Sequence, residues 1–255
     1  MTKPVRPQAG PYDAVICDID GCLSPESTTP FDLASLAELA RRNRRAIETG
    51  QGPIVTLCSG RPQPFAEAMT RAIGNTHLPL VCENGVWLYD PRDNTSTLDP
   101  RITNEHLAIV RDAEAWVRSQ LGPRGVTIQP GKAASVSLYH PDPAYLRDKI
   151  LTLVAQAFRV CGWPFRVSMT WFYINCDLDF ISKATGIERL IERTGLDPTR
   201  LAGIGDTPSD AAIADHVAWF GCPANADEKI KPRADVVSEK AEAEGVLELL
   251  DQLAP

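Results

Sequence analysis

The sequence predicts an α/β fold: a parallel sheet core with helices on both faces, plus an inserted α+β domain. Two observations support this prediction. At both ends of the 255-residue chain, short segments that are apolar throughout alternate with amphipathic helices, a pattern typical of a parallel sheet covered on both faces. In the middle of the chain, apolar and polar side chains alternate along the strand-like segments, as they do in half-buried antiparallel strands.

The first part of the core contains three apolar strands and two helices. Their expected positions are 13–19 (strand), 31–47 (helix), 53–58 (strand), 65–74 (helix) and 78–85 (strand ending in a polar turn). The first helix has its apolar residues at helical spacing and its charges on the other side. The second is expected to end at a glycine.

The same alternation returns near the C-terminus. Helices are expected at 184–195, 208–217 and 244–254, and strands at 201–206 and 217–225. Between the two parts lie a turn-rich pair of short strands, two helices and four alternating strands. Their expected positions are 86–98, 104–122, 126–130, 134–140, 142–158, 165–170 and 171–177. We therefore predict a discontinuous core, residues 1–86 and 180–255, and an inserted domain at 87–179.

Composition excludes several classes of protein. The formal net charge is −7 with no long run of like charges, which argues against a nucleic-acid partner. The four histidines are scattered and the seven cysteines form no C-x-x-C pair, which argues against a zinc site. The segment "MTKPVRPQAG" lacks the apolar region of a signal peptide, and no stretch has the length of a membrane span. We expect a cytoplasmic protein, a monomer or homodimer, with no membrane partner.

Polar residues gather where the predicted parallel strands end. Asp18 and Asp20 follow the first strand, Ser59-Gly60-Arg61 the second, Glu83-Asn84 the third, and Asp206 and Asp210 a later one. Ligands of open parallel sheets bind outside these carboxyl ends. Carboxylates that converge there raise one another's pKa or require a cation, and a ligand set made only of oxygen favours a hard cation such as Mg²⁺.

Four short segments carry a resemblance to a known family. "DIDGC", "CSGRP", Lys183 and "GDTPSD", in this order, resemble the four motifs of the haloacid dehalogenase-like (HAD) phosphohydrolases. "CENG", "PANADEKIKPRAD" and "EGV" are similar to the branch whose C2-type (Cof-like) cap is inserted between the second and third motifs. The resemblance implies a Rossmann-like core, an inserted cap and a small phosphorylated metabolite as substrate.

The resemblance also implies roles for individual residues. Asp18 would be the nucleophile that forms an aspartyl-phosphate, and Asp20 would exchange protons with the leaving group and the water. Asp18, the backbone carbonyl of Asp20 and Asp206 would hold Mg²⁺. Ser59, Gly60 and Lys183 would bind the phosphoryl oxygens. Asp210 would lie behind these groups or orient Lys183, with Ser209 beside it.

The sequence departs from the family pattern at three positions. Ser59 stands where this branch usually has threonine and keeps the hydroxyl. Ala184 replaces the usual glycine after the lysine, and Ser209 replaces the usual asparagine. We expect activity to survive the last change, because both flanking aspartates are retained.

Other residues allow two interpretations. Arg61 could bind the far end of the substrate or pair with a core carboxylate. Glu83 and Asn84 could shape the junction between core and cap or, equally, contact substrate. In the cap, the possible substrate contacts are Lys132, Ser135, Ser137, His140, Arg166 and Trp171. Each of these lies on an alternating strand or beside one, and could equally belong to a solvated face.

The main hypothesis is a Mg²⁺-dependent phosphomonoester hydrolase acting on a sugar, polyol or phosphoglycerate-like phosphate. A phosphomutase of the same family would pass the phosphoryl group to a sugar hydroxyl instead of water. A phospho-aspartate signalling module also combines aspartates at a sheet edge with a lysine and a hydroxyl. The signalling module explains neither the long insert nor the second carboxylate of the D-x-D-G motif.

Overall fold

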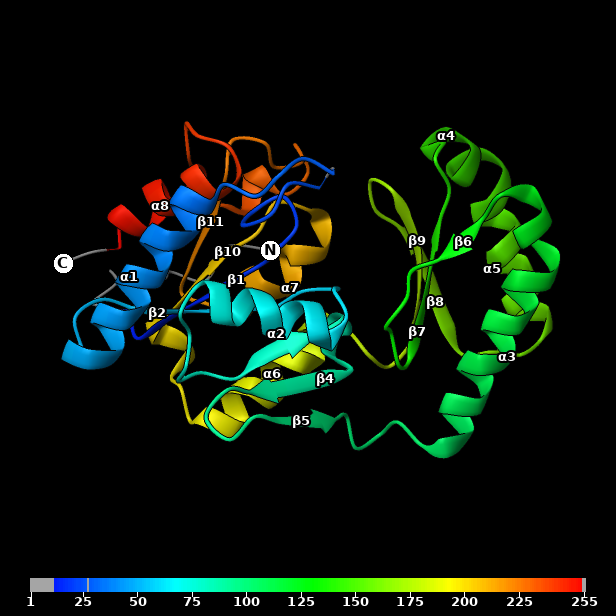
Figure 1. Cartoon of the computed structure of the whole chain (residues 1–255), viewed down its shortest axis with the longest axis horizontal. Helices are drawn as coiled ribbons and strands as arrows, with labels where there is room; N and C mark the ends of the chain where they lie inside the picture. Colours follow the sequence, from blue (N-terminus) through cyan, green and yellow to red (C-terminus); the bar gives the residue numbers. More distant parts are fainter. Residues whose placement is uncertain (1–11, 27, 254–255) are drawn as a thin grey trace. The chain divides into compact units, whose positions relative to one another are not determined.

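A computed structural model describes residues 12–26 and 28–253 of the chain (Figure 1). The N-terminal segment in which we expect no signal peptide lies outside these residues. The chain divides into two compact units. The first is formed by the residues up to Thr97 together with those from Lys183 onward, and the second by Leu98–Ser182.

A five-stranded parallel sheet is the centre of the first unit. Its strands, in spatial order, are β12 (Val236–Val237), β11 (Trp219–Cys222), β10 (Leu201–Ile204), β1 (Ala14–Cys17) and β2 (Ile54–Leu57). Every residue of β1 and β10 is buried, as expected for strands covered on both faces. The central strand β1 therefore has β10 on one side and β2 on the other, and the residues that follow these three strands come together at one edge.

A three-stranded sheet continues beside β2. It consists of β3 (Leu80–Cys82), β4 (Trp87–Asp90) and β5 (Thr95–Leu98), and a parallel bridge between Cys58 and Val81 links it to the end of β2. The sequence-based boundaries place the hairpin β4–β5 in the inserted domain at 87–179. In the structure the second unit begins only at Leu98, so nearly all of the hairpin belongs to the first unit. The physical reason is that β4 pairs with β3, and Tyr89 and Trp87 pack into the core of the first unit.

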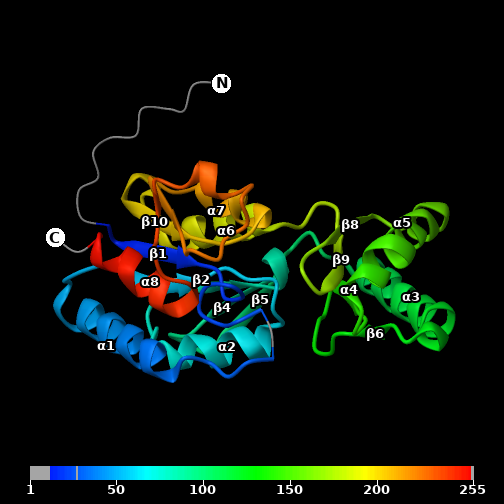
Figure 2. The ribbon, with the colours of Figure 1, turned by 90° about the horizontal axis from the view of Figure 1, so that it is seen from above.

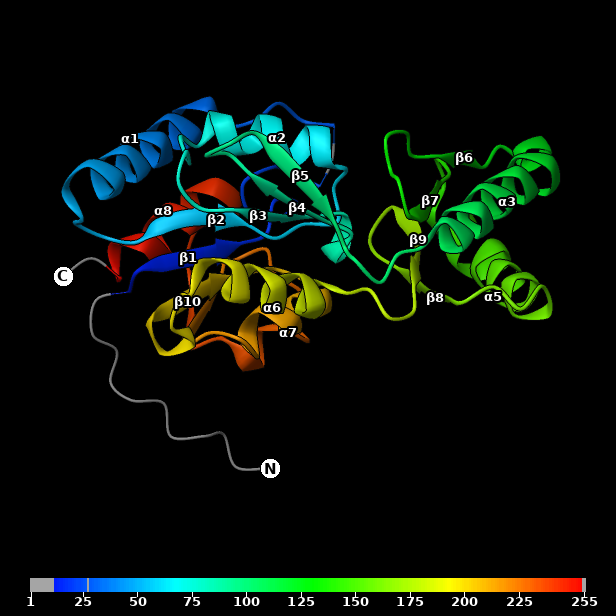
Figure 3. The same cartoon turned by 90° about the horizontal axis from the view of Figure 1, so that it is seen from below.

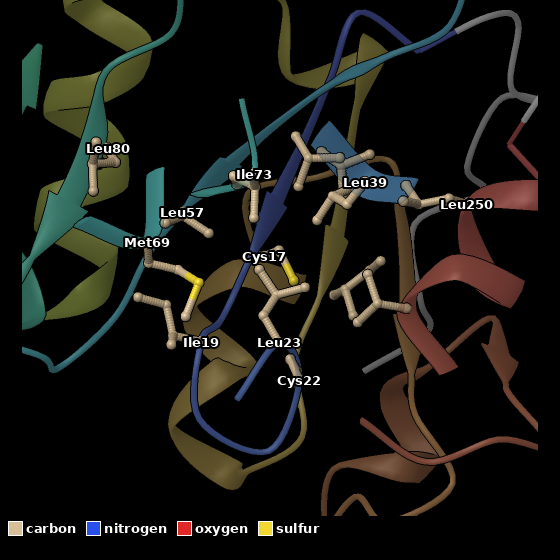
Figure 4. Packing of buried hydrophobic residues seen from close by; sticks show 14 of the residues in the cluster. Cys17, Ile19, Cys22, Leu23, Leu39, Leu57, Met69, Ile73, Leu80 and Leu250 are labelled. Carbon is tan, nitrogen blue, oxygen red and sulfur yellow. The ribbon is translucent and has the colours of Figure 1, made fainter. Parts of the chain in front are cut away.

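Helices cover both faces of the parallel sheet. On one face lie α1 (Leu33–Thr49), α2 (Gln63–Ala72) and α8 (Glu242–Asp251), and on the other α6 (Lys183–Thr194) and α7 (Ala211–Ala214) (Figure 2 and Figure 3). Each face has its own hydrophobic core. Figure 4 shows Cys17 and Leu57 of the sheet in one cluster with Leu39 of α1, Met69 of α2 and Leu250 of α8. The predicted fold class is confirmed.

Helix α1 shows how the sequence sets these elements. Asp32 caps it by accepting hydrogen bonds from the backbone N–H groups of Ala34 and Ser35 at 3.0 and 3.1 Å, the ordinary role of aspartate at a helix start. Leu36 and Leu39 lie on its buried face, at the spacing of one helix side. Gly50 ends the helix in the left-handed conformation, with φ of 67°, which glycine adopts at little cost.

The second unit is a four-stranded antiparallel sheet with helices on one face. Its elements are α3 (Asn104–Gln120), β6 (Thr127–Ile128), β7 (Ser135–Tyr139), α4 (Pro143–Tyr145), a π-helical turn (Leu146–Ile150), α5 (Leu151–Val160), β8 (Phe165–Met169) and β9 (Tyr173–Leu178), with strand order β6-β7-β9-β8. Val136, Leu138, Ile174 and Cys176 face the helices and form the core of this unit. Short 3₁₀ turns complete the chain at Glu83–Gly85, Gly122–Arg124, Pro198–Arg200, Pro208–Asp210 and Lys231–Arg233.

All seven cysteines are free thiols, and Cys17, Cys58 and Cys82 are completely buried, as expected for small apolar side chains in strands. None of the helices in the described part of the chain combines the length and the hydropathy needed to cross a bilayer.

Asn43 on α1 provides a test of the core. Its side chain is completely buried; its amide donates to the carbonyls of Val55 and Ile73 at 3.2 and 2.8 Å, and its oxygen accepts from Val55 N–H at 2.7 Å. Asn43→Leu keeps the branched shape of the side chain, with bulkier methyl ends, but leaves these buried backbone groups unpaired, so we expect the free energy of unfolding to fall by about 3 kcal/mol. Denaturant unfolding measures this loss. Arg44→Ala, on the exposed side of the same helix, is the control, and an equally small change in both variants would contradict the prediction.

Candidate functional site

The carboxyl ends of β1 and β10 bring three aspartates together. Asp18 follows β1, and Asp206 and Asp210 follow β10, the strand that pairs with it. All three are buried, and one carboxylate oxygen of each lies within 4.8 Å of the others. The convergence comes directly from the parallel register of the two strands, Cys17 being opposite Ile204.

Asp18 is held at both carboxylate oxygens. Its Oδ1 accepts a hydrogen bond from the backbone N–H of Ile19 at 2.7 Å, and its Oδ2 accepts one from the ammonium group of Lys183 at 2.6 Å. Burial and the adjacent charge of Asp210 raise the pKa of Asp18 to about 8, although Lys183 acts in the opposite direction. The carboxylate is therefore fixed in orientation, but the positive charge of Lys183 does not compensate for its burial and for the charge of Asp210.

Lys183 links two of the aspartates. It is the first residue of α6 and is buried, and its ammonium group donates to Asp18 and to Asp210 at 2.6 and 2.7 Å. Burial alone would lower the pKa of this lysine, but the two carboxylates raise it well above its ordinary value. Lys183 is thus a permanent cation at the strand tips.

Asp210 organises the loop after β10. Its Oδ1 accepts from Lys183, and its Oδ2 accepts from the backbone N–H groups of Asp206 and Thr207 at 3.0 and 2.9 Å and from the Thr207 hydroxyl at 3.1 Å. The loop approaches it so closely that a Cβ on Gly205 would lie 2.3 Å from the Asp210 Cβ. Both oxygens of Asp210 are consequently occupied by protein donors.

Asp206 has a different environment. Among residues 12–26 and 28–253, no group donates a hydrogen bond to its buried Oδ1. Gly21 passes beside its carboxylate, with φ of 74°, and a Cβ there would lie 1.9 Å from Asp206 Oδ2. Burial and the charges of Asp210 and Asp18 raise the pKa of Asp206 to about 9. A buried oxygen without a hydrogen-bond donor is energetically unfavourable, and a cation bound at this oxygen would stabilise the carboxylate.

Asp20 lies two residues after Asp18 but has another partner. Arg61 holds it with Nε at 2.9 and 2.7 Å from the two carboxylate oxygens and Nη2 at 2.5 Å from Oδ1. The two side chains are about a quarter exposed, 22% for Asp20 and 24% for Arg61, and the guanidinium also lies over the ring of Phe65. Of the two interpretations of Arg61, the structure shows the pairing with a core carboxylate.

Ser59 and Gly60 follow β2. Ser59 is buried, and its hydroxyl oxygen accepts from the backbone N–H of Arg61 at 3.2 Å, which uses a lone pair and not the hydroxyl proton. Gly60 lies against the side-chain amide of Asn84, whose oxygen would be 3.1 Å from a Cβ at Gly60. Asn84 therefore contacts the loop that carries Ser59.

The remaining predicted residues have other hydrogen-bond partners. Ser209 is exposed, and its hydroxyl lies 2.9 Å from that of Thr207. Lys132 and His140 belong to the second unit. Lys132 donates to Ser137 Oγ at 2.6 Å, and His140 Nδ1 accepts from the backbone N–H of Asp142 at 3.0 Å.

Sequence reasoning missed two residues near the cluster. Burial and the charge of Asp20 raise the pKa of Glu26 to about 7, against the effect of Arg61. Asn225 donates from its amide to the carbonyl of Gly21 at 2.9 Å and accepts from the N–H of Glu242 at 2.8 Å. Glu26 lies in a loop with no motif signal, whereas Asn225 stands in the segment "PANAD", where the family resemblance could have drawn attention to it.

Comparisons with known proteins show which family the chain resembles. The family model of the haloacid dehalogenase-like hydrolases matches residues 15–118 and 145–250. A phosphoglycolate phosphatase from Methanosarcina acetivorans is 30% identical over 249 residues, covering 95% of this chain and 96% of the relative. One from Methanopyrus kandleri is 28% identical over 240 residues, covering 94% and 96%.

Solved structures share the fold of this chain. A haloacid dehalogenase-like hydrolase from Bacteroides thetaiotaomicron superposes with a TM-score of 0.73 at 17% identity, covering 95% of this chain and 99% of that one. Because the family model matches well over half of the chain, the chain belongs to the haloacid dehalogenase-like hydrolases.

Proposed function

We propose that this chain is a Mg²⁺-dependent phosphomonoester hydrolase that works through an aspartyl-phosphate on Asp18. The observation that carries the proposal is the buried cluster in which Lys183 bridges Asp18 and Asp210 while Asp206 keeps an oxygen without a donor. Phosphoryl transfer requires concentrated positive charge around the phosphoryl oxygens and a nucleophile held in line.

Asp18 is suited to attack phosphorus. Hydrogen bonds from Ile19 N–H and Lys183 fix its carboxylate, which removes the cost of orienting it during the reaction. In the first step, an Asp18 oxygen forms a bond to phosphorus, and the bond from phosphorus to the leaving oxygen breaks. In the second, water attacks phosphorus, inorganic phosphate leaves, and the carboxylate of Asp18 is restored. Lys183 neutralises charge on the phosphoryl oxygens, and the hydroxyl of Ser59 donates a hydrogen bond to one of them.

Asp20 exchanges the protons in both steps. Arg61 grips it through two nitrogens, which orients the carboxylate, and its partial exposure gives it access to water. Once the ion pair with Arg61 opens, Asp20 takes up a proton from solvent and delivers it to the leaving oxygen; as a carboxylate again, it accepts a proton from the attacking water. Arg61 is thus a positioning residue for Asp20.

The residues fit a divalent cation. When all three buried carboxylates are ionised, they exceed the one ammonium group by two negative charges. The atoms that could bind an ion are oxygens, which Mg²⁺ prefers. Asp206, through its unpartnered Oδ1, and Asp18 would hold the ion together with the carbonyl of Asp20. Asp210 is instead committed to the loop after β10, because its Oδ2 accepts three hydrogen bonds, whereas each oxygen of Asp18 accepts one and keeps a lone pair for the ion. When bound, Mg²⁺ supplies charge neutralisation at the phosphoryl group.

The substrate we propose is a small phosphorylated acid of the phosphoglycolate or phosphoglycerate type. Two relatives that match nearly the whole chain at 28% and 30% identity carry the name phosphoglycolate phosphatase. Sugar phosphates and polyol phosphates are the next substrates we expect. The cytoplasmic location and the monomeric or homodimeric state stay predictions.

The first test is phosphate release from 2-phosphoglycolate, 3-phosphoglycerate, glycerol phosphate and a hexose phosphate, with and without Mg²⁺. We expect turnover only with Mg²⁺, and Asp18→Asn to lower kcat by at least about a thousandfold because the nucleophile is lost. Asp13→Asn is the matched control, since Asp13 precedes the same strand at its other end and pairs with Arg200.

Parental turnover in Asp18→Asn would refute the mechanism. Activation by a sugar bisphosphate without phosphate release would identify a mutase, and a long-lived phospho-Asp18 with negligible turnover would identify a signalling module. Either of these outcomes replaces the hydrolase proposal.

The second test uses stability instead of activity. Folded Asp18 and Asp206 have pKa values of about 8 and 9, above their ordinary 3.8. At pH values between 3.8 and these folded pKa values, the folded state keeps protons that the unfolded chain has released. The metal-free protein therefore loses stability as pH rises from about 4 to 9. Mg²⁺ replaces those protons. We therefore expect saturating Mg²⁺ to raise the Tm by several degrees, roughly 3–6 °C, at pH 8.5 and by about 1 °C at pH 5.

Thermal unfolding with Mg²⁺ and with a chelator measures this difference. Asp206→Asn should abolish the Mg²⁺ effect, whereas Asp251→Asn, an exposed carboxylate, should retain it. A Tm shift of equal size at both pH values would contradict the charge argument.

The third test concerns Ser209, which replaces the usual asparagine. Its exposed hydroxyl lies 2.9 Å from that of Thr207 and outside the aspartate cluster, so we expect Ser209→Asn to change kcat by less than about threefold. Thr207→Val removes the hydroxyl that donates to Asp210 and should lower kcat more. A near-inactive parent that gains activity from Ser209→Asn would show that serine impairs the site.

A further inference from the structure

The 3₁₀ turn Glu83–Gly85 after β3 has an unusual backbone. Three consecutive residues are left-handed, with φ of 51° at Glu83, 54° at Asn84 and 107° at Gly85. Such a conformation costs of order 1 kcal/mol or more at a residue other than glycine, and it persists only where the surroundings enforce it. Glu83 and Gly85 are buried, so the turn is enforced from inside the first unit.

The left-handed turn serves the loop that carries Ser59. The N–H of Glu83 donates to the carbonyl of Arg61 at 2.9 Å, and the N–H of Asn84 donates to the carbonyl of Ser59 at 3.0 Å. In an extended strand, successive N–H groups point to opposite sides. The left-handed backbone turns two consecutive N–H groups toward the same loop, and the Asn84 amide then covers Gly60.

The other side of the turn contacts helix α6. Gly186 lies one turn after Lys183, and a Cβ there would be 2.9 Å from the Cα of Gly85 and 2.4 Å from Val81 Cγ1. Arg189, one turn further on, donates to the carbonyl of Gly85 at 3.0 Å. The turn is therefore packed between the Ser59–Arg61 loop and the helix whose first residue is Lys183.

We propose that Glu83–Gly85 is a positioning turn that sets Ser59 and Lys183 at the separation needed to bind one phosphoryl group, with Asn84 as its central positioning residue. Ser59 and Lys183 come from distant parts of the chain, and the turn is bonded to the loop of one and packed on the helix of the other. The assignment rests on the proposed function, because it concerns phosphate binding by these two residues.

The test compares two substitutions at Asn84 by calorimetric titration with inorganic phosphate in the presence of Mg²⁺. Alanine resists φ of 54°, whereas glycine adopts it freely. We expect Asn84→Ala to weaken phosphate binding about tenfold and to raise KM more than it lowers kcat. Asn84→Gly should bind within about threefold of the parent.

Three results would overturn the assignment. Parental binding in Asn84→Ala, even with a lowered Tm, would mean that the turn serves stability alone. Equal losses in both variants would mean that the amide side chain, and not the backbone, sets the loop. Parental binding in a folded Gly186→Ala would mean that the contact with α6 is dispensable. Gly122→Ala, where a Cβ meets no atom within 4 Å, is the matched control and should bind phosphate as the parent does.

Phosphate binding by the parent, Lys183→Met and Asn84→Ala distinguishes a failure of the positioning turn from a failure of the proposed function. A parent chain that binds no phosphate, or that binds it unchanged after Lys183→Met, overturns the proposed function and the positioning turn with it. A parent that binds phosphate and loses it with Lys183→Met, but keeps it with Asn84→Ala, overturns the positioning turn alone.

Discussion

The contact of Lys183 with Asp18 and Asp210 is the interaction on which the site depends. Taking these charges out of water costs several kcal/mol for each ion, which only short, well-aligned hydrogen bonds offset. The distances of 2.6 and 2.7 Å meet that requirement. They do so because β1 and β10 are parallel neighbours in register and α6 begins at the lysine itself. Sheet order and helix start together bring the three charges into contact.

The dense packing of these charges explains where glycine is required. Gly21 lies against the Asp206 carboxylate, and Gly205 lies against Asp210. At either position a side chain would displace a buried carboxylate from its partners. Gly21 directly follows Asp20, and Gly205 directly precedes Asp206. The glycines of these two motifs are therefore needed because the backbone passes close to a carboxylate, and not only because of the reaction chemistry.

Much of this could be predicted from the sequence, because it depends on local pattern. Apolar strands gave the parallel sheet, and residues at strand ends gave the convergence of Asp18, Asp206 and Asp210. The hairpin β4–β5 could not be assigned to a unit, since alternation with period two does not say which strand is the partner. Whether Arg61 pairs with Asp20 or with a ligand depends on the distance between the loops after β1 and β2, which no local sequence pattern encodes. The left-handed backbone of Glu83 and Asn84 is likewise enforced by tertiary packing, against the preference of glutamate.

The D-x-D-G motif shows how neighbouring carboxylates acquire different chemistry. Asp18 is buried and bonded to a buried lysine, whereas Asp20, two residues on, is partly exposed and bonded to an arginine from another loop. Groups placed in such unlike environments take unlike roles in proton and phosphoryl transfer. The buried carboxylate is oriented by the N–H of Ile19 and by Lys183, as the proposed nucleophile has to be. The partly exposed one can open its ion pair and exchange a proton with water. The proposed separation of roles thus follows from which cation each carboxylate contacts, and that is decided by the loops after β1 and β2 and by the start of α6.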